Sequence, residues 1–189
     1  MTRIIAGQAR GRRLNVPPGQ GTRPTSDRAR EGLFSALDAR LKGLHGIRLV
    51  DAYAGSGAVG LEALSRGAAA ALLIESDRRA AEVIKGNLSQ LGLSGGRLVP
   101  DRVEKLAAEP CPGEPYDVLF LDPPYALDAQ ALADLVTAFA EQGWLAADAL
   151  VCVERASRDP EWNWPAGFES LRSRAYGEGM LWYGQRREQ

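Results

Sequence analysis

An acid, two prolines and a tyrosine follow directly after the apolar run Val118 to Leu121. The exocyclic amine of a nucleobase is a poor nucleophile, because its lone pair is delocalised into the ring. Two acceptors aimed at its N–H groups, the carboxylate of Asp122 and the backbone carbonyl of Pro123, would draw the nitrogen toward tetrahedral geometry and free the lone pair for attack on a methyl group. The rings of Pro123 and Pro124 fix the backbone, and Tyr125 can stack on the base, a contact worth about 1–3 kcal/mol. Taken alone, an Asp-Pro-Pro sequence is more simply a turn, but beside a methyl donor this run would form a catalytic site for methyl transfer to an amine.

A glycine-rich segment, Gly55 to Gly60, fits the pattern G-x-G-x-x-G and follows another apolar run. Its glycines let the chain turn tightly, so a ligand can approach the backbone of Gly55, Ser56 and Gly57 at the start of a helix. Glu75 comes 20 residues after Gly55, where a carboxylate can accept hydrogen bonds from both hydroxyls of a ribose. The order of strand, loop, helix, strand and acid predicts a nucleoside-containing cofactor.

Two cofactor classes share this arrangement, dinucleotides and S-adenosylmethionine. A dinucleotide places its pyrophosphate at the helix N-terminus, whereas S-adenosylmethionine carries an ammonium that an acid can bind directly or through water. Asp51 stands just before the loop and favours S-adenosylmethionine, although its carboxylate can also cap nearby backbone N–H groups. A nicotinamide-dependent oxidoreductase is the alternative, and it lacks an evident general acid because the single histidine, His45, falls outside the strand ends.

The positive charge is concentrated at the N-terminus. Residues 1–30 carry seven arginines and one acid, a formal charge of +6, and the other residues carry −7. A cationic segment on an acidic body is expected where one face meets a polyanion, although a solvated, arginine-rich strand pair would have the same composition. The arginines predicted to contact RNA are Arg3, Arg10, Arg12, Arg13 and Arg23.

The elements that position these residues alternate between strand and helix patterns with short connections, which is typical of a parallel, doubly wound α/β sheet. The expected strands lie near 47–52, 70–75, 97–100, 116–121 and 149–154, with an antiparallel hairpin near 168–175 and 180–185. The expected helices lie near 58–66, 77–91, 102–108 and 128–142. In such sheets ligands bind beyond the carboxyl ends of the strands, and both the glycine loop and Asp122 fall there.

A basic hairpin and one helix precede this core. Residues 3–6 and 12–16 read as its short strands, and the prolines and glycines of 17–21 then break regular structure. The Thr-Ser-Asp cluster at 25–27 begins a helix, which we expect to end at Gly46.

Length and composition describe one ordinary globular domain. With 189 residues, 45% hydrophobic residues and a net charge of −1, the chain can bury a sizeable core and is not intrinsically disordered. We expect a single domain over 1–189, with a basic extension over 1–45 and a catalytic core over 46–189.

Several function classes are excluded by what the sequence contains. Its apolar runs are far shorter than the roughly 20 residues of a membrane span, and the N-terminus has no secretory pattern. Cys111, Cys152 and His45 form no metal-ligand pattern. We therefore expect a cytoplasmic protein with reduced thiols, no metal and no membrane contact, and we take a monomer as the default.

Six segments together resemble the bacterial 16S rRNA (guanine-N2)-methyltransferases, the RsmD family of class I methyltransferases. They are RIIAGQARGRRL (3–14), RPTSDRARE (23–31), DAYAGSGAVGLEALSRGA (51–68), IESD (74–77), LDPPY (121–125) and QGWL (142–145). The resemblance implies S-adenosylmethionine as methyl donor, guanine N2 in 16S rRNA or a small-subunit particle as acceptor, and Asp122, Pro123 and Tyr125 in the roles described above.

The resemblance also implies that Arg23, Thr25 and Arg28 lie near the amino-acid end of the cofactor or at the mouth of the site, although a capped helix with solvated arginines explains them equally. Two positions depart from the family pattern. Ser76 stands where a bulky residue often covers the adenine, and Arg102 stands where an acid or amide often meets the adenine amine. Backbone groups or Asp101 would then recognise the adenine.

Three other functions remain open from the sequence. The Asp-Pro-Pro-aromatic run suits any exocyclic amine, so adenine N6 or cytosine N4 in DNA or RNA is an alternative acceptor. A nicotinamide-dependent oxidoreductase and a non-catalytic RNA-binding assembly factor are alternatives from other classes.

Overall fold

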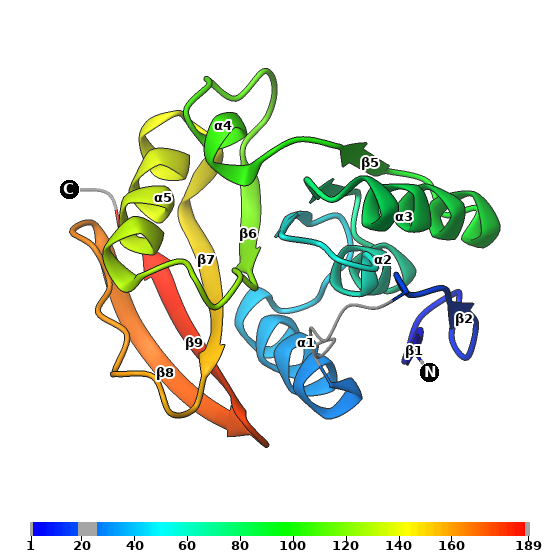
Figure 1. Cartoon of the computed structure of the whole chain (residues 1–189), viewed down its shortest axis with the longest axis horizontal. Helices are drawn as coiled ribbons and strands as arrows, with labels where there is room; N and C mark the ends of the chain where they lie inside the picture. Colours follow the sequence, from blue (N-terminus) through cyan, green and yellow to red (C-terminus); the bar gives the residue numbers. More distant parts are fainter. Residues whose placement is uncertain (1, 19–25, 188–189) are drawn as a thin grey trace.

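The computed structural model describes residues 2–18 and 26–187 and is built around one seven-stranded sheet (Figure 1). The strand order is β5-β4-β3-β6-β7-β9-β8, in which β9 and β8 are antiparallel and the other five strands are parallel. The strands are β3 (Arg48–Ala52), β4 (Ala70–Ile74), β5 (Gly96–Val99), β6 (Tyr116–Leu121), β7 (Leu145–Ala156), β8 (Phe168–Tyr176) and β9 (Gly179–Arg186). The predicted mostly parallel α/β sheet with an antiparallel C-terminal hairpin is confirmed.

In the part of the chain that the structure describes, five helices cover the two faces of the sheet. They are α1 (Asp27–Leu41), α2 (Ala58–Ser65), α3 (Arg78–Leu91), α4 (Val103–Ala107) and α5 (Ala129–Glu141). Apolar residues of α4 and α5 pack with one set of strand residues, such as Val50 and Leu119, and α1 and α2 pack with the alternate set, such as Leu49 and Val118. This alternation follows from the period of two in a strand. No helix in the described ranges is long and apolar enough to cross a membrane.

The start and end of α1 have clear local causes. Ser26 is its N-cap, since its hydroxyl accepts a hydrogen bond from the Ala29 N–H at 3.1 Å. The helix ends at Leu41, and Lys42 adopts a left-handed conformation with φ of 57°. The predicted end at Gly46 is therefore wrong, because Lys42 already turns the chain.

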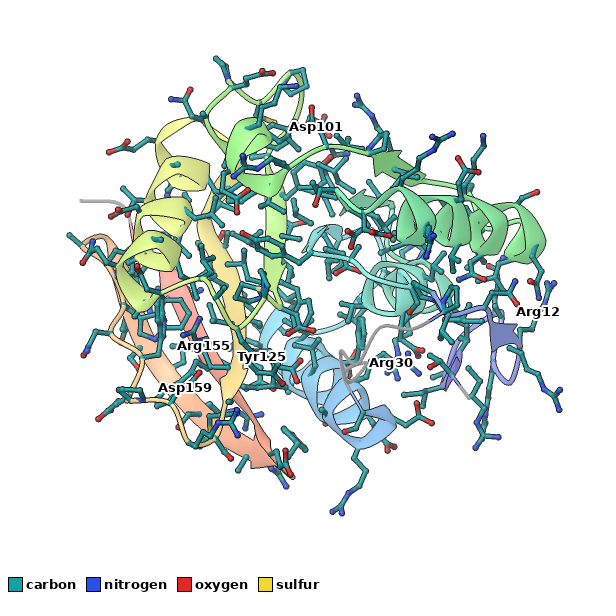
Figure 2. The ribbon with its side chains drawn as sticks, viewed as in Figure 1. Arg12, Arg30, Asp101, Tyr125, Arg155 and Asp159 are labelled. Atoms are coloured by element: carbon teal, nitrogen blue, oxygen red, sulfur yellow. The ribbon has the colours of Figure 1, made fainter. Side chains whose placement is uncertain are left out.

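The predicted N-terminal hairpin is present, with strands shorter than expected: β1 is Thr2–Arg3 and β2 is Arg13–Leu14. The backbone N–H groups of Ile5 and Ala6 bind the carboxylate of Glu62 on α2, at 2.8 and 2.9 Å, instead of a neighbouring strand. Glu62 is fully buried and lies 3.8 Å from the buried guanidinium of Arg30 on α1; Arg30 is labelled in Figure 2. The Ile4 backbone still pairs with Gly11 and Arg12 across the hairpin, so docking onto α2 replaces strand pairing from Ile5 onward.

Candidate active site

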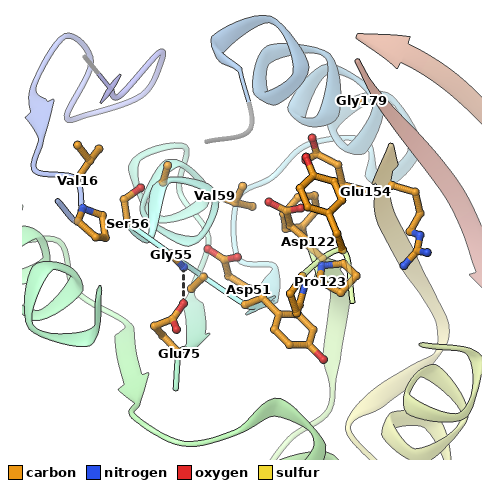
Figure 3. A pocket seen from close by; sticks show the side chains of 18 of the residues that line it. Val16, Asp51, Gly55, Ser56, Val59, Glu75, Asp122, Pro123, Glu154 and Gly179 are labelled. Carbon is orange, nitrogen blue, oxygen red and sulfur yellow. Dashed lines mark hydrogen bonds between the residues drawn. The ribbon is translucent and has the colours of Figure 1, made fainter. Parts of the chain in front are cut away.

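A cavity of about 430 Å³ opens at the carboxyl ends of β3, β4, β6 and β7 (Figure 3). This is the edge at which α/β sheets bind ligands. Its walls are formed by residues from 53–59, 75–76, 122–125, 154–156 and 16–17. The structure thus brings the glycine loop, Glu75 and the Asp-Pro-Pro-Tyr run into one cavity, as the sequence predicts.

The glycine loop turns from β3 into α2 with little free space. Gly57 is the N-cap of α2 and has φ of 80°, and a Cβ there would lie 2.9 Å from the Leu73 side chain. A Cβ on Gly60 would also meet Leu73 at 2.9 Å. Glycine at both positions lets the loop and helix pack tightly on β4. Gly55 and Ser56 line the cavity, whereas Gly57, also predicted to bind the cofactor, does not.

Asp51, at the end of β3, is 1% exposed and lines the cavity. One oxygen accepts a hydrogen bond from the Gly60 N–H at 2.8 Å, so the capping role considered for this residue is present. Burial, together with the nearby charge of Glu75, raises the pKa of Asp51 to about 7. A buried acid with one capping bond is suited to a cationic ligand group, which would stabilise its ionised form.

Glu75 follows the last residue of β4 and also lines the cavity. Its two carboxylate oxygens accept hydrogen bonds from the Gly55 N–H and the Asp77 N–H, both at 2.8 Å. These bonds fix the carboxylate at the mouth of the glycine loop, and each oxygen keeps a further lone pair for a ligand hydroxyl. Ser76, which follows it, is exposed.

Asp122 follows the last residue of β6 and faces the same cavity. Its pKa is raised well above the ordinary carboxyl value, first by burial and then by the negative charges of Glu154 and Asp51. Pro123 is buried, whereas the ring of Tyr125 is 69% exposed. The site therefore combines a sheltered carboxylate with an aromatic ring open to an incoming molecule.

Comparisons with known proteins give the family of this chain. A family model described as conserved hypothetical protein 95 matches residues 2–185. Ribosomal RNA small subunit methyltransferase D of Escherichia coli K12 is 39% identical over 176 residues, an alignment covering 93% of this chain and 85% of that protein. The Haemophilus influenzae protein of the same name is 36% identical over 160 residues, covering 84% and 80%. This chain belongs to the small subunit methyltransferase D family.

Solved structures agree with this family assignment. The putative methyltransferase yhhF from Escherichia coli superposes with a TM-score of 0.86 and 36% identity, covering 99% of this chain and 98% of that one. A magnesium protoporphyrin IX methyltransferase from Synechocystis with bound S-adenosylmethionine has a TM-score of 0.65 at 14% identity, covering 84% and 78%, and supports the fold alone. Two predictions are confirmed, namely the class I methyltransferase fold and a methyltransferase that uses S-adenosylmethionine.

The cavity of this family member fits that cofactor. Its volume lies within the range of roughly 300–1,000 Å³ typical of small-molecule sites. The cavity is lined by the carboxylate of Glu75, which would suit ribose hydroxyls, and by the buried acid Asp51, which would suit an ammonium, beside the start of α2. Within the described ranges, no group of three or more acidic, histidine or cysteine side chains is arranged to hold a metal.

The predicted arginines that the structure describes, namely Arg3, Arg10, Arg12, Arg13 and Arg28, do not line the cavity. Arg28 lines a second, smaller hollow together with Arg3 and Arg10, so the structure does not bring it to the cofactor cavity. Arg3, Arg10 and Arg13 are exposed on the hairpin. Arg23 and Thr25, also predicted as site residues, lie outside the described residues.

Arg12 has a structural contact besides its exposure. Its guanidinium donates to the backbone carbonyls of Gln90 and Leu91, at 2.6 and 3.5 Å. A cation at these last carbonyls of α3 is favourable for the helix dipole. This guanidinium therefore binds the protein itself, whereas the sequence prediction assigns it to an RNA contact.

Two parts of the cavity wall were missed by the sequence reasoning. Glu154 follows an apolar run within β7, just as Asp122 follows the apolar strand β6. An acid after an apolar run was therefore a sequence signal for Glu154. Val16 and Pro17 reach the cavity because Asn87 of α3 holds the preceding residue, Asn15. The Asn87 side chain accepts from the Asn15 N–H at 2.9 Å and donates to the Asn15 carbonyl at 3.0 Å and to the Ser56 carbonyl at 3.0 Å. One buried amide thus joins the N-terminal segment to the glycine loop.

Proposed function

We propose that this protein transfers a methyl group from S-adenosylmethionine to the exocyclic N2 amine of a guanine in 16S rRNA of the small ribosomal subunit. The observation that carries the proposal is one cavity shared by Asp122, the glycine loop and Glu75. A relative that is 39% identical to this chain is named for its action on small-subunit ribosomal RNA. This similarity supports rRNA as the substrate.

The cofactor end of the cavity is formed by three features. Glu75 accepts hydrogen bonds from the ribose hydroxyls, and the backbone at 55–57 lies along the nucleoside and the amino-acid portion. Asp51 binds the ammonium, directly or through water, which favours its ionised form. S-adenosylmethionine supplies the methyl group as an electrophile on its sulfonium.

The acceptor end activates the amine. The carboxylate of Asp122 and the backbone carbonyl of Pro123 accept hydrogen bonds from the N2 amine, and the exposed ring of Tyr125 stacks on the purine. When the nitrogen forms its new bond to carbon it must lose a proton. Asp122, whose pKa is raised by burial and by neighbouring acids, is suited to accept that proton.

The RNA surface includes the basic hairpin. Arg3, Arg10 and Arg13 are exposed there and would contact phosphates, which orient the RNA without reading its sequence. The target base must leave its stack, by flipping or by lying in an exposed loop, in order to reach Asp122.

The test is mass spectrometry of 16S rRNA nucleosides from a strain lacking the gene, before and after treatment of its small subunits with the purified protein and S-adenosylmethionine. We expect N2-methylguanosine to be missing from the strain and restored by the wild-type protein but not by the Asp122→Ala variant. Restoration of N6-methyladenosine or N4-methylcytidine would refute the guanine assignment, and full restoration by Asp122→Ala would refute the catalytic role of Asp122.

A further inference from the structure

A second acid stands beside Asp122 at the acceptor end of the cavity. Strands β6 and β7 are parallel and pair Phe120 with Cys152 and Leu121 with Val153. The same register places Asp122 next to Glu154, and in-register neighbours point to the same face of a sheet. Both acids line the cavity, and Figure 3 shows them together at the carboxyl ends of their strands.

The two acids influence each other electrostatically. The negative charge of Glu154 is the second cause, after burial, of the raised pKa of Asp122. The adjacent cation, Arg155, is engaged elsewhere, since it donates to the Leu127 carbonyl at 2.8 Å and lies 3.3 Å from the Asp159 carboxylate. Asp122 and Glu154 are therefore neighbouring carboxyl groups at the acceptor end of the cavity.

The first residue of β9 leaves room for the Glu154 carboxylate. A Cβ at Gly179 would lie 3.0 Å from one oxygen of Glu154, closer than ordinary van der Waals contact. Glycine at this position allows the acid to lie across the start of β9 and along the cavity wall. The position of Glu154 thus depends on both strands that pair with β7, namely β6 and β9.

Two adjacent acceptors match the hydrogen-bonding edge of guanine. Guanine carries two neighbouring donors on its Watson–Crick edge, the N1–H and the N2 amine, and enzymes that act on extruded bases read this edge by hydrogen bonds. Adenine has an acceptor at N1 beside its amine, and cytosine has an acceptor at N3 beside its amine. A carboxylate next to the amine-binding acid would repel either of these bases.

We propose that Glu154 is a specificity-determining residue that accepts the N1–H of the target guanine while Asp122 accepts a hydrogen bond from N2. This inference rests on the proposed function, because it assumes that the acceptor is a purine with an amine at C2. Drawing the N1 proton toward Glu154 also increases electron density on the attacking amine.

The test exchanges the target base for one with the same amine and no N1–H. The modified guanine is first mapped, and small subunits are then reconstituted with 16S rRNA carrying either guanine or 2-aminopurine at that position. We expect the wild-type protein to prefer guanine in kcat/KM by about 10- to 100-fold, the discrimination expected when a paired hydrogen-bonding group is mismatched. The Glu154→Gln variant, whose amide can donate to a bare N1, should lower this preference at least tenfold, with a gain on 2-aminopurine.

Two further variants separate selectivity from folding and from general charge. Glu154→Asp keeps an acceptor and should retain the preference for guanine at reduced kcat. Glu178 is an exposed acid between β8 and β9 that lines the same cavity, and Glu178→Gln should leave the preference within about twofold of wild type. Binding of S-adenosylhomocysteine should stay within about threefold in all three variants, which also reports on their folding.

The proposal is overturned if the wild-type protein methylates 2-aminopurine as fast as guanine, if Glu154→Gln keeps the wild-type preference, or if Glu178→Gln changes it as much. These outcomes are distinct from failure of the proposed function, which would appear earlier as a methylated base other than guanine in the mapping experiment.

Discussion

The buried acid at the end of β3 gives the sharpest test of the cofactor site. Asp51 has a pKa of about 7 in the folded protein, whereas an unfolded chain ionises it at about 3.9. Because the folded pKa is the higher one, the stability that the protonated acid contributes is complete below about pH 4 and is lost as the pH rises toward about 7. The loss is at most about 1.36 kcal/mol per pH unit and amounts to about 2 kcal/mol between pH 5 and 7, and to about 3 kcal/mol between pH 5 and 8.

The Asp51→Asn variant keeps an oxygen to accept the Gly60 N–H but cannot ionise. Without cofactor, its free energy of unfolding relative to wild type should therefore rise by about 3 kcal/mol between pH 5 and pH 8, measured by urea denaturation at both values. If the difference between the two proteins is the same at both pH values, the reasoning about Asp51 is refuted.

Cofactor binding should show the opposite dependence on pH. If Asp51 binds the ammonium of the cofactor, its ionisation between pH 6 and pH 7.5 should strengthen binding of S-adenosylhomocysteine by about eightfold in the wild type. The Asp51→Asn variant should bind more weakly at pH 7.5 and show little change over this range in calorimetric titrations. Equal pH profiles in the two proteins would remove Asp51 from the ammonium site.

Three further predictions follow from other contacts. Asp122→Ala should lower kcat by at least about 100-fold while the dissociation constant of S-adenosylmethionine changes less than about threefold. In the wild type, kcat/KM should rise with pH, because the raised pKa keeps Asp122 protonated at low pH. A flat pH profile of kcat/KM would contradict the role of Asp122 as proton acceptor. Asn87→Ala leaves the Asn15 backbone groups unpaired and should lower the free energy of unfolding by about 1–3 kcal/mol. It should also weaken cofactor binding, because the Ser56 carbonyl loses its hydrogen bond. Unchanged denaturation and binding would show that the Asn87 amide does not stabilise the glycine loop. Replacing Arg10 and Arg13 by glutamine should weaken RNA binding and flatten the slope of log K against log salt by about 0.7–0.9 for each lost phosphate contact, and an unchanged slope would place the RNA surface elsewhere.

The parts of the site that could be predicted from the sequence are those carried by local patterns. The glycine loop, Glu75 and the Asp-Pro-Pro-Tyr run each follow an apolar strand, and a parallel sheet brings all strand ends to one edge. The end of α1 was missed because Leu44 continues the apolar spacing beyond the left-handed Lys42. Tertiary packing, rather than the helix, buries Leu44.

Contacts between distant segments could not be predicted. Asn87 lies between Ile84 and Leu91 on the buried face of α3, so a polar residue on an apolar stripe was a visible signal. Its partner, Asn15, is 72 residues away, and no local pattern connects them. The same reasoning applies to Arg12. Its positive charge suits a contact with the end of α3 and a contact with RNA equally, so the sequence does not distinguish the two.

The link between Asn15 and Asn87 also has a consequence for biosynthesis. The chain is made from its N-terminus, so the basic hairpin emerges 72 residues before the amide that holds it, roughly 4–14 s earlier at bacterial and eukaryotic elongation rates of about 5–20 residues per second. During that interval the arginines are tethered to a translating ribosome without their docking surface. The nascent enzyme can therefore form the hydrogen bond between Asn87 and the Ser56 carbonyl of the glycine loop only after α3 has been synthesised.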